Sequence, residues 1–280
     1  MPDKIALITG ASSGFGLLTS IELAKAGFHV VATMREPGRR QRLDQAATDA
    51  ETASHIDVRR LDVTQFETIP AFIDALVHDY GHLDVLVNNA GFAVAGFAED
   101  IQLDELRYQF ETNFFGAVAM TKAALPVMRR QRSGHIIQIS SISGLCGAFT
   151  VSSYSASKHA LEGWSESLRL EVSSLGIRVV LVEPGAFATD IWTRGAVMGK
   201  QATKDTSPNF QKSLRMRERV AKIPKADPIE VARTIVAIAQ HPNPRLRYLV
   251  GRDAKIQLAM KRVLPWKRFE KVIANFLKVE

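Results

Sequence analysis

Cysteine is almost absent from this sequence of 280 residues, in which Cys146 stands alone. One cysteine cannot form a disulfide within the chain, which excludes a disulfide-held fold and agrees with a reducing compartment. Long apolar runs are also missing, and the start "MPDKIALITG" passes directly into a strand-like segment without the pattern of a signal peptide. We therefore expect a cytoplasmic protein.

Internal repeats and low-complexity tracts are missing too, which excludes solenoid and linker-like architectures. We expect no bound metal and no nucleic-acid partner. The chain is 46% hydrophobic and long enough to bury a substantial core. These properties favour one large α/β domain over residues 1–280.

The charge is unevenly distributed along the chain. Residues 1–190 carry 16 Lys/Arg against 22 Asp/Glu, a net −6, whereas residues 191–280 carry 20 against 7, a net +13. A basic final third could suit phosphate-bearing ligands, an anionic membrane surface or nucleic acid. Solvated charge on helix surfaces is the commoner explanation.

Short apolar runs alternate with segments of helical periodicity. The runs predict strands at 5–9, 29–34, 55–61, 83–88, 135–140, 177–184 and 247–251. Helices are predicted between them, for example at 15–27 and 68–81. This alternation indicates a doubly wound parallel sheet of about seven strands with helices on both faces. Residues 191–227 interrupt the pattern with polar and basic sequence, and we interpret them as a substrate lid.

A glycine-rich turn follows the first predicted strand. In "TGASSGFG", Gly10, Gly14 and Gly16 lead directly into a helix. Glycines here permit a tight turn and close approach of the backbone to a pyrophosphate, which the N–H groups and dipole of the helix N-terminus attract. The pattern favours dinucleotide binding; the alternative is that the glycines only form a turn.

The end of the second strand bears on which dinucleotide binds. Enzymes that use NAD usually place an acid here for the ribose 2′-hydroxyl, but Met34 stands at that position and Arg35 follows it. Arg39 and Arg40 are near, so a 2′-phosphate would meet cations. We expect NADP(H) to be preferred, with NAD(H) possible, because a strand ending one residue later would present Glu36.

Tyr154 and Lys158 in "YSASK" lie four residues apart, about one helical turn, so that both side chains share a face. A phenol with a pKa near 10 exchanges protons poorly at neutral pH unless a neighbouring cation stabilises its phenolate. The pair therefore suggests acid–base chemistry. Alone it is weak, because a solvated helix can carry such a spacing by chance.

The order of motifs resembles the short-chain dehydrogenase/reductase family over nearly the whole chain. The motifs are "TGASSGFG", "LDVT" with Asp62, "NNAG" at 88–91, "TNFFG" with Asn113, "ISSISG", "YSASK" and "EPG" at 183–185. The segments "ATMRE", "EPGAFATDIW" and "LPWKRFE" look most similar to a subgroup that includes 17β-hydroxysteroid and retinol dehydrogenases. The resemblance implies a single Rossmann-type domain and an oxidoreductase with an NAD(P) cofactor.

The resemblance also implies roles for particular residues. Tyr154 would be the general acid for ketone reduction, with Lys158 lowering its pKa and binding the nicotinamide ribose. Ser141 would bind the substrate oxygen, and Asn113 would help to hold a proton-relay water. Ser140 and Ser143 are near enough to Ser141 to be alternatives. The cofactor set is Gly10, Ser12, Ser13, Gly14, Phe15, Gly16, Arg35, Asp62, Val63, Asn89, Ala90, Gly91, Tyr154, Lys158, Pro184, Gly185 and Thr189. In it Asp62 would contact the adenine side, Asn89 would lie near the ribose and Thr189 would bind the nicotinamide carboxamide.

The residues next to these motifs suggest the substrate. They are apolar: Phe92, Val94, Phe97, Leu145, Cys146, Phe149, Phe187, Ile191 and Trp192. We therefore expect a lipophilic ketone or aldehyde and the corresponding alcohol, handled by a homodimer or homotetramer. The alternative is a non-catalytic dinucleotide-binding regulator that uses the basic final third to bind nucleic acid or a partner protein.

The C-terminal extension, residues 253–280, is basic and amphipathic. Its apolar residues recur at helical spacing: Ile256, Met260, Val263 and Leu264, then Trp266, Phe269, Ile273 and Phe276. Lys261, Arg262, Lys267, Arg268 and Lys271 lie between them, and Pro265 separates two predicted helices. We expect the apolar stripe to pack on protein; docking on an anionic bilayer is the alternative.

Overall fold

The computed structural model describes residues 4–189, 191, 196–223 and 225–277. Its centre is a seven-stranded sheet in the order β3-β2-β1-β4-β6-β7-β9, in which every pairing is parallel. The strands are β1 (Lys4–Ile8), β2 (Phe28–Met34), β3 (Ile56–Arg60), β4 (Val85–Asn88), β6 (Gly134–Ile139), β7 (Ile177–Pro184) and β9 (Arg247–Val250). All seven strands predicted from the sequence are present, and the doubly wound parallel sheet is confirmed.

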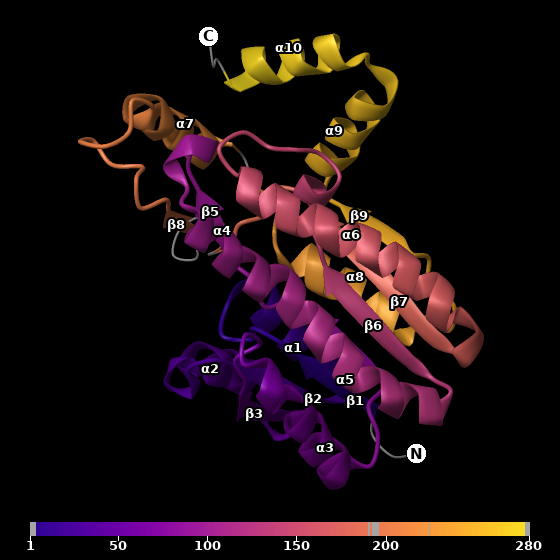
Figure 1. The fold of residues 1–280 in the computed structure, drawn as a ribbon. Coiled ribbons are helices and arrows are strands. Elements are labelled where there is room, and N and C mark those ends of the chain that lie inside the picture. The colour runs from indigo at the N-terminus through magenta and orange to yellow at the C-terminus, as the bar shows by residue number, and fades with distance from the viewer. Residues whose placement is uncertain (1–3, 190, 192–195, 224, 278–280) are drawn as a thin grey trace.

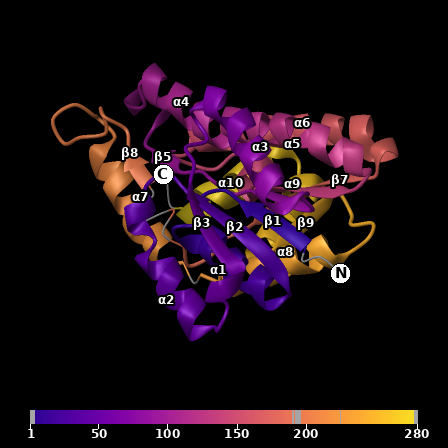
Figure 2. The same cartoon turned by 90° about the horizontal axis from the view of Figure 1, so that it is seen from below.

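Helices cover both faces of the sheet. They are α1 (Gly14–Lys25), α2 (Gln41–Asp49), α3 (Ile69–Tyr80), α4 (Leu103–Phe110), α5 (Gly116–Gln131), α6 (Ser152–Val172), α7 (Phe210–Lys222), α8 (Ile229–Gln240), α9 (Arg252–Val263) and α10 (Trp266–Leu277). Figure 2 shows α3, α5 and α6 on one side of the sheet and α1, α2 and α8 on the other.

Each face of the sheet has its own core because successive residues of a strand point to opposite faces. In β1, Ala6 and Ile8 pack with α1, α2 and α8, whereas Ile5 and Leu7 pack with α3, α5 and α6. Both sets are buried, which explains why the strands read as continuous apolar runs rather than alternating ones.

The strand order reverses between β1 and β4, so the connections after these two strands diverge to opposite faces. In open α/β sheets this divergence leaves a crevice at the carboxyl ends of the strands, where ligands bind. The glycine-rich turn follows β1 and "NNAG" begins within β4, which places both motifs at this edge. The topology of the sheet therefore brings these two sequence motifs together at the carboxyl ends of β1 and β4.

A second, two-stranded parallel sheet was not expected from the sequence. It pairs β5 (Ala93–Ala95) with β8 (Ala196–Met198), and so ties the segment after β4 to the segment after β7. In Figure 1, β5, β8, α7, α9 and α10 gather at one end of the molecule. The described part of residues 191–227 thus has strand and helix of its own. Among the described residues, no helix combines the length and apolarity that a membrane span requires.

Candidate active site

The turn between β1 and α1 is shaped by glycines that no other residue can replace. Gly10 has φ +71°, and a Cβ added there would lie 2.8 Å from the Cα of Ala90. A Cβ on Gly16 would lie 2.3 Å from the carbonyl oxygen of Gly10. The backbone therefore folds tightly at the start of α1 and leaves its N–H groups accessible to an anion. This geometry fits a dinucleotide pyrophosphate.

Thr9 and Asn89 hold the turn against the end of β4. The Nδ2 of Asn89 donates to the carbonyl oxygens of Thr9 at 2.8 Å and Gly10 at 3.0 Å. The hydroxyl of Thr9 accepts from the backbone N–H groups of Asn89 and Ala90, both at 3.0 Å. Asn89 thus supports the glycine turn, in addition to its expected position near the ribose. Thr9 also supports the turn, and no sequence motif pointed to it.

The N-terminus of α1 presents small polar side chains. Ser13 is the N-cap residue, but its hydroxyl does not bond to the first turn of the helix. Ser12, Ser13 and Gly14 are partly exposed, and the Cβ of Thr189 lies 3.7 Å from where a Cβ on Gly14 would be. Thr189 therefore borders the glycine turn, and its contact with the nicotinamide carboxamide stays a prediction.

Phe15 points away from this polar surface. Its ring packs edge-on against Phe187, with the centroids 5.8 Å apart. Phe187 lies in the loop after Pro184 and Gly185, so this contact joins the first helix to the loop that follows β7. The ring of Phe15 thus contributes to packing.

The ends of β2 and β3 form the far end of the crevice. Arg35 follows β2, with its side chain 55% exposed, and donates from Nη1 to the hydroxyl of Tyr108 at 3.1 Å. Glu36 is held by Arg39 at 2.8 Å and lies 3.6 Å from Arg35, so its charge is largely compensated. After β3, the carboxylate of Asp62 accepts from the N–H of Thr64, which orients it, and Val63 is buried.

Tyr154 and Ser141 meet at the centre of the crevice. Tyr154 lies in the first turn of the long helix α6, and Ser141 is the N-cap of the short helical turn Ile142–Gly144 that follows β6. The two side chains share a hydrogen bond, which lowers the pKa of the phenol, but burial outweighs it and raises the pKa of Tyr154 to about 12. This direction is opposite to the lowering that the resemblance assigns to Lys158.

Lys158 lies one turn further along α6, fully enclosed. Its Nζ is 5.7 Å from the centroid of the Tyr154 ring and donates to the carbonyl oxygen of Ile139, at the end of β6, at 2.7 Å. Burial lowers the pKa of Lys158 to about 8, while the charge of Glu162 acts in the opposite direction. The ammonium is thus fixed beside the phenol and can change its charge state near neutral pH.

Asn113 is buried in a π-helical segment, Glu111–Phe115, between α4 and α5. Its side chain makes paired hydrogen bonds with the backbone of Phe92, accepting at 3.1 Å and donating at 3.0 Å. It also donates to Ser157 of α6 at 3.3 Å. A π-helical turn frequently marks a functional site, and this one joins α6 to Gly91, which lies against Asn113.

The wall next to Tyr154 is apolar. Ala93 and Val151 are buried with the tyrosine, and Ala95, Ala148 and Ile191 pack against them. Phe97 and Phe149 stack edge-on at 5.3 Å, with both rings half-buried. The structure corrects part of the expected pocket: Phe187 is buried in the sheet core, and Cys146 and Leu145 pack with α9. Trp192 lies outside the described residues.

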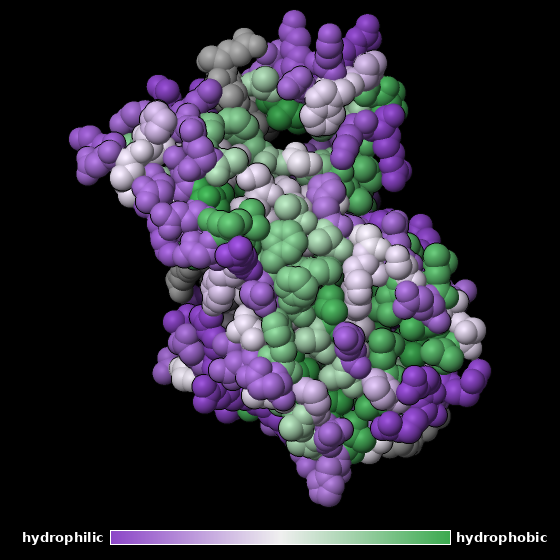
Figure 3. Space-filling view, in the orientation of Figure 1, coloured by the Kyte–Doolittle hydropathy of each residue, from purple (hydrophilic) through white to green (hydrophobic). Residues whose placement is uncertain are grey.

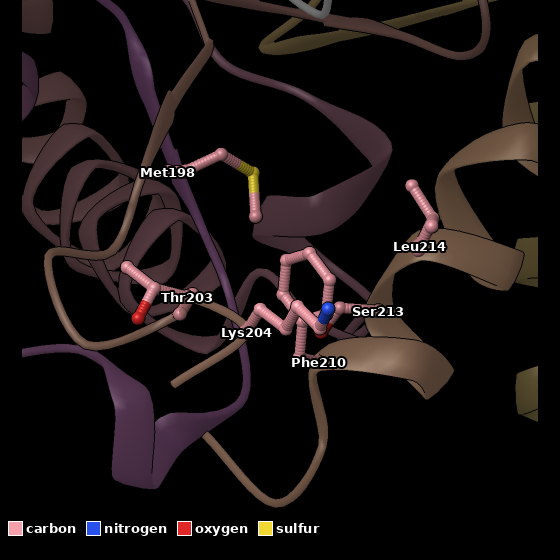
Figure 4. A pocket seen from close by; sticks show the side chains of 7 residues that line it. Met198, Thr203, Lys204, Phe210, Ser213 and Leu214 are labelled. Carbon is pink, nitrogen blue, oxygen red and sulfur yellow. The ribbon is translucent and has the colours of Figure 1, made fainter. Parts of the chain in front are cut away.

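A pocket of about 270 Å³ opens within residues 198–214, beside the wall and not at Tyr154 itself. Figure 4 shows the side chains of Met198, Lys204 and Phe210 turned toward it. Its lining is Met198, Ala202, Thr203, Lys204, Phe210, Ser213 and Leu214. Met198 pairs with Ala95 across the small sheet, so the pocket adjoins the apolar wall.

The arrangement defines a class of protein: a dinucleotide-binding oxidoreductase with a serine–tyrosine–lysine set at the cofactor crevice. The sequence profile of the short chain dehydrogenases matches residues 4–196. The chain belongs to this family, and it is an NAD(P)-dependent dehydrogenase or reductase that acts on CH–OH groups. The enzymatic interpretation of the sequence is therefore confirmed.

Characterised and uncharacterised relatives agree with this assignment. The chain is 41% identical to the uncharacterized oxidoreductase YusZ of Bacillus subtilis over 99% of both chains, and 36% identical to a 3-ketodihydrosphingosine reductase of Bacteroides thetaiotaomicron over 94% and 93%. It is 43% identical to human retinol dehydrogenase 8 over 67% of this chain and 60% of that one. These relatives confirm the resemblance to retinol dehydrogenases.

Solved structures show the same fold. A short-chain dehydrogenase from Streptomyces avermitilis superimposes with a TM-score of 0.81 at 33% identity, over 99% of this chain and 97% of that one. ElxO with bound NADP gives a TM-score of 0.73 at 27% identity, over 88% and 96%. The similarity to the first of these structures extends over nearly the whole chain.

Proposed function

We propose that this enzyme interconverts a lipophilic ketone or aldehyde and the corresponding alcohol with NADP(H), and that Tyr154 is the general acid and base. One observation carries the proposal: Tyr154 and Ser141 share a hydrogen bond beside a buried Lys158, at the edge of the sheet where the glycine turn forms a dinucleotide cradle. When bound there, the nicotinamide would supply or accept the hydride.

The protein's own residues would handle the proton. In reduction, the hydroxyl of Ser141 donates to the substrate oxygen, and Tyr154 gives its proton to that oxygen as it becomes an alkoxide. Lys158 stabilises the phenolate that remains. In oxidation the same phenolate accepts the alcohol proton. Because burial alone raises the pKa of Tyr154, a positive charge close to the phenol is required for either direction.

The apolar wall and its neighbouring pocket support a lipophilic substrate. The relatives named above include a reductase of 3-ketodihydrosphingosine and a retinol dehydrogenase, both named for lipophilic compounds. A panel of long-chain ketones, aldehydes and short polar carbonyls, assayed with NADPH and with NADH by nicotinamide absorbance, tests the proposal. Turnover of polar carbonyls alone would contradict the lipophilic assignment.

Arg35 carries the proposed NADPH preference, because it stands at the end of β2 with a partly exposed guanidinium and compensates Glu36. We expect Arg35→Ala to weaken NADPH binding roughly ten- to a hundredfold, since a charged hydrogen bond to the 2′-phosphate is lost. NADH binding should change little. Titration of nicotinamide fluorescence measures both dissociation constants.

Arg40→Ala is the matched control for Arg35. Arg40 was also expected near a 2′-phosphate, but it is the N-cap residue of α2, and its exposed side chain pairs with Asp44 of that helix at 2.8 Å. Arg40→Ala should leave the ratio of the NADPH and NADH dissociation constants unchanged. Equal weakening of NADPH and NADH in Arg35→Ala would make Arg35 a structural residue, held by Tyr108, and would reopen the choice of cofactor.

We also propose that the enzyme assembles as a homodimer or homotetramer in the cytoplasm. Apolar side chains gather over α4 and α5 on the face seen in Figure 3. Leu103 and Tyr108 of α4 and Phe115, directly before α5, are exposed although they are large and apolar. An exposed apolar area of this kind supports a subunit contact.

The first half of the C-terminal extension packs on its own domain. Ala254 and Leu258 of α9 lie in one cluster with Ile142, Leu145 and Cys146, directly after Ser141. Removal of residues 255–280 should therefore lower the melting temperature by roughly 4 °C or more and reduce turnover, because the loop that carries Ser141 loses its support. Thermal unfolding and steady-state kinetics measure the two effects.

Removal of residues 265–280 keeps α9 and tests α10 separately. Val263 and Trp266 are 79% and 63% exposed, whereas Phe269 is buried. If α10 packs on protein, this shorter truncation should change stability or oligomeric state, and the full chain should not sediment with anionic vesicles at physiological salt. Salt-sensitive sedimentation, lost in a truncated enzyme that stays folded and active, would establish membrane docking instead.

A further inference from the structure

A second charged cluster lies directly behind the catalytic lysine. Glu162 follows Lys158 by four residues on α6, so their side chains share one face of the helix. The Glu162 side chain is only 6% exposed. A carboxylate so deeply buried needs a partner, because desolvation strongly disfavours its charged form.

Arg247 of β9 is that partner, and it is shared. Its Nη1 bonds both to Oε2 of Glu162 and, at 2.5 Å, to Oε1 of Glu183 at the end of β7. Its Nη2 bonds to the more exposed Glu166 at 2.6 Å. One guanidinium thus links two buried carboxylates, and the cluster connects the helix of Tyr154 to the strand that ends at Pro184.

The buried charges balance only when Lys158 is included. Glu162 and Glu183 contribute two negative charges, and Arg247 contributes one positive charge. Lys158 supplies the second positive charge when protonated. Burial and the charge of Glu162 raise the pKa of Glu183 to about 7, while Arg247 and Arg262 of α9 oppose that rise. Lys158 and Glu183 therefore both exchange protons near neutral pH.

One oxygen of Glu162 is not bonded to Arg247. Within the described residues, Oε1 of Glu162 is enclosed and has no hydrogen-bond partner, and the same is true of the Ser140 hydroxyl. Both atoms surround Gly144: a Cβ there would lie 2.7 Å from Ser140 Oγ and 3.2 Å from Glu162 Oε1. The glycine leaves the space that brings this carboxylate toward the active-site loop.

We propose that Glu162 is a positioning residue that keeps Lys158 protonated, and that Arg247 holds the Glu162 carboxylate in place for this purpose. The inference deepens the proposed function, on which it rests, by adding a layer behind the serine–tyrosine–lysine set. Without the negative charge, Lys158 loses its proton at lower pH, and the phenolate of Tyr154 loses its stabilising charge.

Glu162→Gln tests the proposal through the pH dependence of carbonyl reduction. In Glu162→Gln, the alkaline limb of the pH profile of kcat/KM should move to lower pH by about one unit. The loss of kcat/KM relative to the wild type therefore grows with pH and reaches roughly tenfold above the limb. Glu162→Asp withdraws the carboxylate and should give a smaller shift in the same direction. It carries the test if Glu162→Gln does not fold.

Glu166→Gln is the matched control, since Glu166 binds the same arginine from the same helix but is largely exposed. Its limb should stay at the wild-type pH. An unchanged limb in an active, folded Glu162 variant, or an equal shift in Glu166→Gln, overturns the proposal.

A readout without turnover separates this inference from the proposed reaction. The chain has four tyrosines, so the near-ultraviolet phenolate signal of Tyr154 can be isolated by subtracting each variant's Tyr154→Phe counterpart. With NADP⁺ present, Glu162→Gln should raise the pH at which this phenolate forms. No carbonyl turnover in the wild type would contradict the proposed function, and an unshifted phenolate titration would contradict the role of Glu162.

Discussion

Tyr154→Phe is expected to lower kcat by roughly 10²- to 10⁴-fold, because a positioned general acid contributes that much to a proton transfer. The substitution removes one hydroxyl from a buried side chain and keeps the ring that packs against Ala93 and Val151. The free energy of unfolding should therefore change little. Stopped-flow measurement of the chemical step, together with NADPH titration, separates lost chemistry from lost binding.

The expected pattern is a fall in kcat with an almost unchanged dissociation constant for NADPH. Tyr108→Phe is a suitable control, because it also removes one tyrosine hydroxyl, here the one that accepts from Arg35 at the other end of the crevice. Turnover of Tyr154→Phe within a few-fold of the wild type would mean that another group delivers the proton.

The fold was predictable because its signals are local and repeated. Seven apolar runs became seven parallel strands, since a strand buried on both faces needs no polar alternation. The small sheet of β5 and β8 was not predictable in this way. Its strands have three residues each and pair across a hundred residues of chain, and neither carries a pattern that distinguishes it from a loop.

Some residues of the candidate site were likewise predictable from the sequence, and others were not. Glycines at positions 10 and 16 follow from backbone constraints that the sequence displays, and the structure shows the close contacts that demand them. Arg247 could not be found from the sequence, because its significance comes from Glu162 and Glu183, which lie 85 and 64 residues away. The spacing of Glu162 from Lys158 was the one available signal.

The pKa of Tyr154 shows why a motif does not determine its own electrostatics. The sequence places a cation one turn away, and the structure confirms that Lys158 is close to the ring. It also shows that the phenol is buried and that the ammonium donates to the backbone of Ile139. Desolvation depends on all the atoms that surround the side chain, so it cannot be inferred from the spacing of two residues.

Lys158→Ala is expected to be more damaging than Tyr154→Phe in one respect: it should impair cofactor binding as well as chemistry. Loss of the ammonium removes the charge that stabilises the phenolate, and we expect kcat to fall by at least the roughly 10²-fold attributed to general acid catalysis. If Lys158 also binds the nicotinamide ribose, the dissociation constant for NADPH should rise about tenfold or more, because a hydrogen bond to a charged group is lost.

Removing the Lys158 side chain also leaves the carboxylates of Glu162 and Glu183 bonded to a single arginine, Arg247. Lys158→Met keeps more of the apolar volume than Lys158→Ala and controls for the cavity. Both variants should lose NADPH affinity and turnover alike, since both lack the ammonium. If Lys158→Met restored either property, packing rather than charge would be the contribution of Lys158, and the stabilising role of its ammonium would have to be abandoned.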